Sequence, residues 1–354
     1  MSRFFSSKYS SLIPYTPGEQ PKDMEYVKLN TNESPYKPSE NVYEAVKKEA
    51  EKLHLYSDPE AKIITEKIAK RYGVSPDMVL VTNGSDEVLN FAFMAYGDSQ
   101  REMLFPEISY GFYTVFADLN GVKYRQVPLK NDFSIDVNDY IAKNTTIVIA
   151  NPNAPTGLAL SRNQIEEIVK SNPNNVVVID EAYVDFGAES CVDLVHKYEN
   201  LLVTMTFSKS RSMAGARIGF GIGSKAIIND LNTIKYSTNP YNVNRISQVA
   251  GACAIDDDKY YMDNCKKIIE SREYTKIELE KMGFMVLNSS ANFLFAKSDK
   301  ISGEELYLKL KENGVLVRHF KAEKIKDFNR ITIGAKEQMD IFLKKTKEIL
   351  EAVK

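Results

Sequence analysis

Short runs of valine, isoleucine and leucine alternate with helical patterns through the middle of this 354-residue chain. Seven runs have the length of strands, at 78–82, 101–105, 122–127, 145–150, 175–180, 201–206 and 217–223. Nearly continuous apolar runs are typical of strands buried on both faces, and helices are the usual connections between parallel strands. The pattern therefore predicts an α/β fold with a mostly parallel seven-stranded sheet and helices on both faces.

The pattern changes after about residue 236. One long helical stretch is expected from about 245 to 282, followed by apolar runs at 283–287, 291–296, 314–318 and 330–334 with further helices. This mixture predicts a smaller α+β domain, which the proline-rich N-terminal arm joins. We expect a large domain over 60–245 and a smaller one formed by 1–59 and 246–354.

Composition excludes several classes of partner. The formal net charge is −2, with acidic and basic residues mixed along the chain, which argues against nucleic-acid and anionic-membrane partners. No apolar run approaches the roughly 18 residues of a membrane span, and the N-terminus lacks the apolar core of a secretion signal. The three cysteines and three histidines lack metal-ligand spacing, so we expect reduced thiols, a cytoplasmic protein and no metal site.

Polar residues follow several of the expected strands, where open α/β sheets bind ligands. Asn83-Gly84-Ser85-Asp86 follows the first strand and opens a helix, so it is either a phosphate site or a plain helix cap. The segment 151–157 contains two prolines and a glycine, and either forms a stiff loop of fixed shape or simply ends a strand.

Two charged residues complete this set. Asp180 ends an apolar strand and stays ionised there only beside a cation or strong donors, unless it is a helix cap or part of a structural ion pair. Lys209 follows the next strand, eight residues before Arg217, and could also be a lysine whose amine reaches solvent. A phosphate cradle, a buried carboxylate and a buried amine at one sheet edge suit pyridoxal phosphate, which has a phosphate, a cationic ring and an aldehyde.

The chain also resembles the fold-type-I pyridoxal-phosphate-dependent aminotransferases, and among them the histidinol-phosphate branch. The resemblance runs almost end to end. It is carried, in the family's order, by "KLNTNESPYKPS" (28–39), "LYSDP" (55–59), "VTNGSDEVL" (81–89), "NPNAPTG" (151–157), "VVIDEAYVDF" (177–186), "SKSRSMAGARIGF" (208–220), "NFLF" (292–295), "GVLVR" (314–318) and "RITIG" (330–334).

The resemblance implies a role for each matching residue around the cofactor. Lys209 is similar to the lysine that forms the Schiff base and moves the substrate proton, Asp180 to the partner of the ring nitrogen, and Tyr183 to a donor to the ring oxygen. The cofactor phosphate is held in this family by residues that match Gly84, Ser85, Asp86, Ser208 and Arg217, and Tyr110 matches an aromatic residue that stacks on the ring.

Other matches concern the substrate and a second subunit. Tyr56 resembles a tyrosine that reaches the neighbouring subunit's cofactor, which implies a homodimer with shared active sites. Arg330 and Arg318 match arginines that bind the substrate phosphate, Arg330 also the carboxylate of 2-oxoglutarate, and Tyr15 and Asn30 match positions that cover the site.

One position departs from the family pattern. Where relatives commonly have an asparagine that donates to the ring oxygen, this chain has Ala154, an alanine that some relatives share. We expect Asn153 or a water molecule to supply the missing donor, and Tyr183 to carry more of this role if neither does.

The resemblance implies a transaminase of histidine biosynthesis that converts histidinol phosphate and 2-oxoglutarate to imidazole-acetol phosphate and glutamate. An aromatic-amino-acid transaminase and a threonine-phosphate decarboxylase remain alternatives, because the sequence does not reveal which substrate bond faces the ring. A regulator's sensor domain is disfavoured, because no basic arm or DNA-binding segment is visible.

Overall fold

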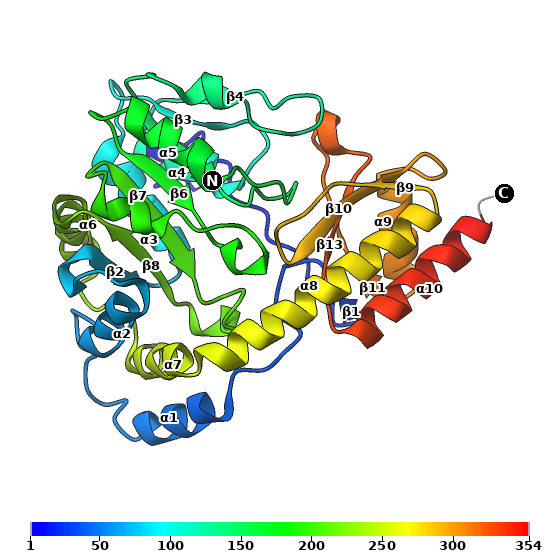
Figure 1. The fold of residues 1–354 in the computed structure, drawn as a ribbon, viewed down its shortest axis with the longest axis horizontal. Coiled ribbons are helices and arrows are strands. Elements are labelled where there is room, and N and C mark those ends of the chain that lie inside the picture. The colour runs from blue at the N-terminus through cyan, green and yellow to red at the C-terminus, as the bar shows by residue number, and fades with distance from the viewer. Residues whose placement is uncertain (1, 353–354) are drawn as a thin grey trace.

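The computed structural model describes residues 2–352 (Figure 1). Its largest sheet has seven strands in the order β2-β8-β7-β6-β5-β3-β4. They are β2 (Val79–Thr82), β3 (Met103–Pro106), β4 (Tyr124–Val127), β5 (Thr146–Ala150), β6 (Val177–Asp180), β7 (Leu201–Thr206) and β8 (Gly219–Gly223). Neighbouring strands run parallel except at β8, which is antiparallel to β2 and β7. The predicted mostly parallel sheet is therefore confirmed.

Helices cover both faces of this sheet. Successive strand residues point to opposite sides, so apolar strands expose apolar side chains on each face, and the helices bury them. Val177 and Ile179 pack on one face, while Val178, between them, packs on the other. The first face is covered by α2 (Lys62–Tyr72), α5 (Arg162–Ser171) and α7 (Arg245–Asp256). The second is covered by α3 (Ser85–Tyr96), α4 (Phe112–Asn120) and α6 (Lys225–Thr238).

Two smaller sheets lie on the other side of the molecule (Figure 1). One is antiparallel, in the order β12-β13-β10-β9, with strands β9 (Phe284–Val286), β10 (Phe293–Ser298), β12 (Arg318–His319) and β13 (Asn329–Thr332). In the other, β1 (Val27–Lys28) of the N-terminal segment pairs in parallel with β11 (Val315–Leu316). All of these strands except β12 share an apolar core with α8 (Asp258–Lys281), α9 (Gly303–Glu312) and α10 (Lys336–Ala352). The domain boundaries near residues 60 and 245 stay a prediction.

The expected single helix over 245–282 is wrong, because the structure has two helices there. The chain leaves the helical path at Asp257, between α7 and α8. The Asp257 carboxylate accepts hydrogen bonds from Ser39 and from Asn41, which lies in α1 (Glu40–Ala50). These distant polar contacts fix the turn, and an apolar pattern that continues across it could not reveal them.

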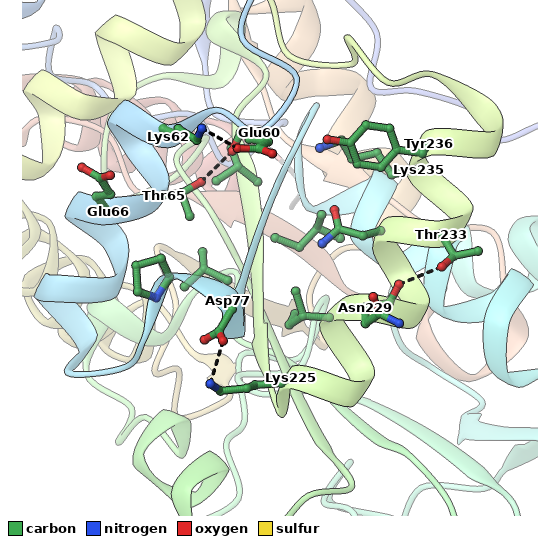
Figure 2. A pocket seen from close by; sticks show the side chains of 16 residues that line it. Glu60, Lys62, Thr65, Glu66, Asp77, Lys225, Asn229, Thr233, Lys235 and Tyr236 are labelled. Atoms are coloured by element: carbon green, nitrogen blue, oxygen red, sulfur yellow. Dashed lines mark hydrogen bonds and ion pairs between the residues drawn. The ribbon is translucent and has the colours of Figure 1, made fainter.

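The outer edge of the seven-stranded sheet borders a groove of about 820 Å³ between α2 and α6 (Figure 2). Its rim carries exposed ion pairs such as Lys225–Asp77, with nitrogen and oxygen 2.7 Å apart. Its buried lysine, Lys235, donates to the carbonyl of Pro59. Exposed ion pairs contribute little to stability, and the hydrogen bond from Lys235 to a backbone carbonyl has a structural role. This larger groove is therefore not the candidate site.

Candidate active site

The candidate site lies where β2, β6 and β7 end. A cavity of about 180 Å³ opens there beyond the carboxyl ends of the strands. It is lined by Thr31, Glu33, Ser85, Asp86, Tyr110, Ala150, Ala154, Asp180, Ala182, Tyr183, Thr206, Ser208, Lys209, Ala214 and Arg217. The structure therefore brings together the lysine, the carboxylate and the phosphate loop that the sequence singled out at separate strand ends.

Asp180 is the last residue of β6, and its side chain is buried in this cavity. The Tyr113 hydroxyl donates to one carboxylate oxygen at 3.1 Å, and the Ala182 N–H donates to the other at 3.2 Å. Burial raises the pKa of Asp180 to about 7, although both donors act to lower it. A carboxylate this buried favours a cationic partner, which suits the ring nitrogen of the expected cofactor.

Lys209 follows β7 and reaches toward Asp180 and Tyr183 from the same edge. Its amine donates to the Thr31 carbonyl at 3.2 Å and lies 5.8 Å from the centre of the Tyr183 ring. Burial lowers the pKa of Lys209 to about 8, and the positive charge of Arg330 acts in the same direction. Much of the amine is therefore neutral at mildly alkaline pH, the form that can attack an aldehyde or accept a proton.

The phosphate end of the cavity is formed by the start of α3. Ser85 and Asp86 are the first two residues of this helix, so their backbone N–H groups lack partners within it. Gly84 has φ +85°, and a Cβ atom there would come within 2.5 Å of the Arg217 guanidinium. Backbone amides, a nearby arginine and the Ser208 side chain make a cradle that fits a phosphate group.

Acidic and aromatic side chains complete the cradle. Asp86 pairs with Arg217 at 3.0 Å and accepts a hydrogen bond from the Tyr110 hydroxyl at 2.7 Å. Tyr110 packs its ring against the edge of Tyr113, with ring centres 5.7 Å apart. Tyr110 lines the cavity, and its stacking on a cofactor ring stays a prediction.

The structure does not support Asn153 as a donor to the cofactor ring. Its side chain is buried, its amide group donates to the Ile108 carbonyl at 3.0 Å and to the Thr156 hydroxyl at 3.1 Å, and its oxygen accepts from Ser109. Both amide hydrogens thus stabilise the loop. The neighbouring residue Ala154 is the one that lines the cavity.

A second cavity of about 500 Å³ adjoins the first and shares Lys209 and Tyr183 with it. Arg318 and Arg330 line it and lie directly opposite each other on β12 and β13. Arg318 donates to the carbonyls of Thr16 and Pro17, and Arg330 donates to that of Asn30. Two positive charges directly opposite each other in a sheet are unfavourable by themselves. This arginine pair therefore suits a ligand with two negative charges.

The two remaining substrate-side residues also line the second cavity. Tyr15 stacks on Phe112, with ring centres 4.3 Å apart. Asn30 is buried and donates from its amide nitrogen to the Glu19 carbonyl at 2.9 Å, while its side-chain oxygen is buried with no hydrogen-bond partner within the described residues. An unused acceptor beside two arginines is consistent with a ligand-binding role.

Tyr56 lies outside both cavities of its own chain. Its side chain is 80% exposed and stacks on Tyr241, with ring centres 4.7 Å apart. Arg245 donates to the Tyr56 carbonyl at 2.7 Å. The ring is therefore presented at the surface.

Sequence reasoning missed three groups at the site. Tyr113 lies within α4 and follows no strand, so strand-end reasoning passed over it, although its hydroxyl donates to Asp180. Thr31 and Asn32 follow Asn30 in the chain. The Thr31 carbonyl accepts a hydrogen bond from Lys209, and the Asn32 side-chain amide donates to Tyr183. The order of polar residues in "LNTNES" was a signal, but strand-end reasoning does not apply to a segment outside the large sheet.

Comparisons with known proteins found similar sequences over nearly the whole chain. The model of the family "aminotransferase class I and II" matches residues 24–345. The chain is 50% identical to histidinol-phosphate aminotransferase of Brachyspira hyodysenteriae, over 99% of this chain and 100% of that protein. It is 46% identical to histidinol-phosphate aminotransferase of Clostridium botulinum (strain Kyoto), over 99% of each.

A solved structure extends the comparison to the fold. Histidinol-phosphate aminotransferase from Sinorhizobium meliloti, in complex with pyridoxal-5'-phosphate, matches with a TM-score of 0.91 over 100% of this chain and 99% of that one. The sequence identity is 22%, so this likeness supports the fold alone.

Proposed function

This chain belongs to the class I and II aminotransferase family, and on that premise we propose that it transfers an amino group between histidinol phosphate and 2-oxoglutarate. The products are imidazole-acetol phosphate and glutamate, the cofactor is pyridoxal 5'-phosphate, and the reaction belongs to histidine biosynthesis. One observation carries the proposal: Lys209 and Asp180 face one cavity that opens directly onto the paired arginines 318 and 330.

The residues of the first cavity divide the work of amino transfer. When bound, pyridoxal phosphate supplies an electron-accepting ring that stabilises negative charge on the substrate carbon. Lys209 would bind the cofactor aldehyde and, once released from it, would carry the proton from the substrate carbon to the carbon that had been the aldehyde. Asp180, held by Tyr113 and Ala182, would keep the ring nitrogen protonated, and Tyr183 would donate to the ring oxygen.

The phosphate of the cofactor is anchored separately. Arg217, Ser208 and the backbone amides at the N-terminus of α3 would bind it. Tyr110 supports the ring face. This anchoring leaves Lys209 free to leave the cofactor and act as a base.

The second cavity binds the substrate phosphate. Arg318 and Arg330 now donate to backbone carbonyls of the N-terminal segment, and a phosphate is a stronger, charged acceptor for the same donors. Tyr15 and Asn30 cover the substrate. In the second half of the reaction, Arg330 binds the carboxylate of 2-oxoglutarate.

A panel of half-reactions tests the substrate. The purified enzyme with bound cofactor is mixed with histidinol phosphate, phenylalanine, tyrosine or threonine phosphate, and the absorbance of the cofactor is followed. We expect the fastest change with histidinol phosphate. A fast change with phenylalanine alone would identify an aromatic transaminase, and release of carbon dioxide from threonine phosphate would identify a decarboxylase.

We further propose a homodimer in which Tyr56 completes the partner's site. The exposed Tyr56–Tyr241 pair, fixed by Arg245, supports this role. Mixing the inactive variants Lys209→Ala and Tyr56→Ala should restore activity, because a mixed dimer contains one site with neither change. Mixtures that remain as inactive as each variant alone would contradict a shared site.

We also propose a cytoplasmic location. The cysteines at 191, 253 and 265 are free thiols in the structure, as expected in a reducing compartment. Within residues 2–352, no helix has the length and apolar character needed to cross a membrane. Fractionation of cells that produce the protein tests the location directly.

A further inference from the structure

We propose that Asn32 is a positioning residue for amino transfer, because it directs the proton of the Tyr183 hydroxyl into the cofactor cavity. Asn32 thereby supports the tyrosine donor at a site where Ala154 supplies none. This inference rests on the proposed function, since it assigns Tyr183 the role of donor to the cofactor ring.

The contact itself is short and buried. The side-chain amide nitrogen of Asn32 donates to the Tyr183 hydroxyl oxygen at 2.9 Å, and Asn32 is 1% exposed. Since this bond uses a lone pair of the tyrosine oxygen, the tyrosine proton is left to point elsewhere. Tyr183 lines both cavities, so the open direction for its proton is toward a ligand there.

The orientation of the Asn32 amide is set by its other contacts. The Thr332 hydroxyl donates to the Asn32 side-chain oxygen at 3.0 Å, so that oxygen faces Thr332 and the amide nitrogen faces Tyr183. The Asn32 N–H donates to Thr332 at 2.9 Å, and its carbonyl accepts from Asn292 at 3.0 Å. A hydrogen bond at every polar group keeps the residue in one orientation.

The backbone of Asn32 carries a further sign of constraint. Its φ is +56°, in the left-handed region that few residues other than glycine adopt. Asparagine tolerates this conformation better than most residues do. A left-handed residue that bonds Thr332 of β13, Asn292 just before β10 and Tyr183 is held for its position rather than for ease of folding.

The opposite side of Tyr183 is apolar. Ala154, Ala291 and Phe293 form a small cluster against which Tyr183 packs, and the Phe293 ring meets the Tyr183 ring edge-on at 5.1 Å between centres. Position 154 therefore supplies only a methyl contact. The polar control of the tyrosine oxygen comes from the N-terminal segment instead.

The charges that face Tyr183 explain why this control matters. Burial raises the pKa of Tyr183, while Arg330 and the hydrogen bond from Asn32 lower it. Asp180 acts in the raising direction, and the Lys209 amine lies over the ring. By stabilising negative charge on the oxygen, Asn32 makes the buried phenol a better proton donor.

A double-mutant cycle tests the inference on the enzyme with bound cofactor. The four proteins are the wild type, Asn32→Ala, Tyr183→Phe and the combination. The first readout is the pH midpoint of the cofactor absorbance change, and the second is kcat and KM for histidinol phosphate. We expect Asn32→Ala to raise the midpoint by about half to one pH unit, because a weaker donor leaves more negative charge on the ring oxygen.

The kinetic signature should separate positioning from binding. We expect kcat of Asn32→Ala to fall about 10-fold, with KM changed less than about 2-fold. In the Tyr183→Phe background, removing Asn32 should change neither the midpoint nor kcat further, because the group through which it acts is gone. Equal effects in both backgrounds, or an unchanged midpoint in a folded Asn32→Ala protein, would overturn the inference.

Two further variants guard the interpretation. Asn329→Ala removes another buried asparagine, whose amide donates to the Gly303 carbonyl away from Tyr183, and should lower stability without moving the midpoint. Thr332→Val removes the contact that orients the Asn32 amide, and it should raise the midpoint less than Asn32→Ala does. It also provides a test of the inference if Asn32→Ala folds poorly. If the wild type binds cofactor but does not react with histidinol phosphate, the proposed substrate is wrong. The pH midpoint of the cofactor absorbance still tests the role of Asn32 in that case.

Discussion

The two adjoining cavities are built in different ways. The smaller one is formed mainly by residues at the ends of strands in one sheet, and its charged groups are held by short contacts such as Tyr113 to Asp180. The larger one is formed by the N-terminal segment, the 107–111 loop and strands β12 and β13, and its arginines bind backbone carbonyls. The comparison suggests that a rigid sheet fixes the chemistry, while segments far apart in the chain select the substrate.

The strongest test of this comparison is removal of the amine in the smaller cavity. Lys209→Ala should lower kcat by at least about 10³-fold, because it removes both the cofactor-binding nucleophile and the base. The matched control is Lys235→Ala, which removes a buried lysine that borders the groove of Figure 2 and contacts the Pro59 carbonyl. Steady-state assays should show near-normal activity for the control, and an equally inactive folded control would contradict the assignment.

The next largest effect should come from the buried carboxylate. Asp180→Asn should lower kcat by about 10²–10³-fold, because an amide cannot hold a positive charge on the ring nitrogen. Glu181 offers a control one residue away, since it is also buried but does not line the cavity. Its carboxylate accepts hydrogen bonds from the Ser190 hydroxyl and the Cys191 N–H. Glu181→Gln should retain kcat within a few-fold in the same assay. Comparable losses in the two variants would point to a general effect of burial.

Changes in the larger cavity should act on binding more than on chemistry. Arg330→Ala should lower kcat/KM for histidinol phosphate by about 10²-fold and Arg318→Ala by about 10-fold, within the range for a charge-assisted hydrogen bond. Arg330 should matter more because its guanidinium lies over the Phe293 ring, which meets the Tyr183 ring, and because its Nε is buried with no hydrogen-bond partner within the described residues. Initial-rate measurements over a range of substrate concentrations separate KM from kcat. A loss confined to kcat would contradict the division between the two cavities.

The smallest expected effect concerns stability against pH in the cofactor-free protein. Burial lowers the pKa of Lys209 from 10.5 to about 8, so between these pH values the unfolded chain binds a proton that the folded chain does not. The free energy of unfolding should therefore gain about 2–3 kcal/mol from this group as pH rises from about 8 to 10.5. Urea unfolding of the wild type and Lys209→Met at several pH values isolates this contribution. Identical pH slopes for the two proteins would show that the amine is more solvated than the structure indicates.

Local patterns predicted the strands of the large sheet well, because burial of a strand on both faces imposes an apolar run that any window of the sequence displays. The same logic found Asp180 and Lys209, since a charged residue directly after such a run stands out. The break at Asp257 was missed because its cause, contacts with Ser39 and Asn41, lies more than 200 residues away. Asn153 was misjudged for a similar reason, since Ile108 and Thr156 use its amide hydrogens.

The sequence alone therefore determined the fold class, the order of the strands along the chain and the chemical groups at their carboxyl ends. These features depend on local periodicity and on the geometry common to parallel sheets. Only the tertiary structure decided which hydrogen-bond partners those groups have, for example Tyr113 for Asp180 and Asn32 for Tyr183. Such partners come together through packing of distant segments, and a hydrogen bond depends on fractions of an ångström that no spacing in the sequence records.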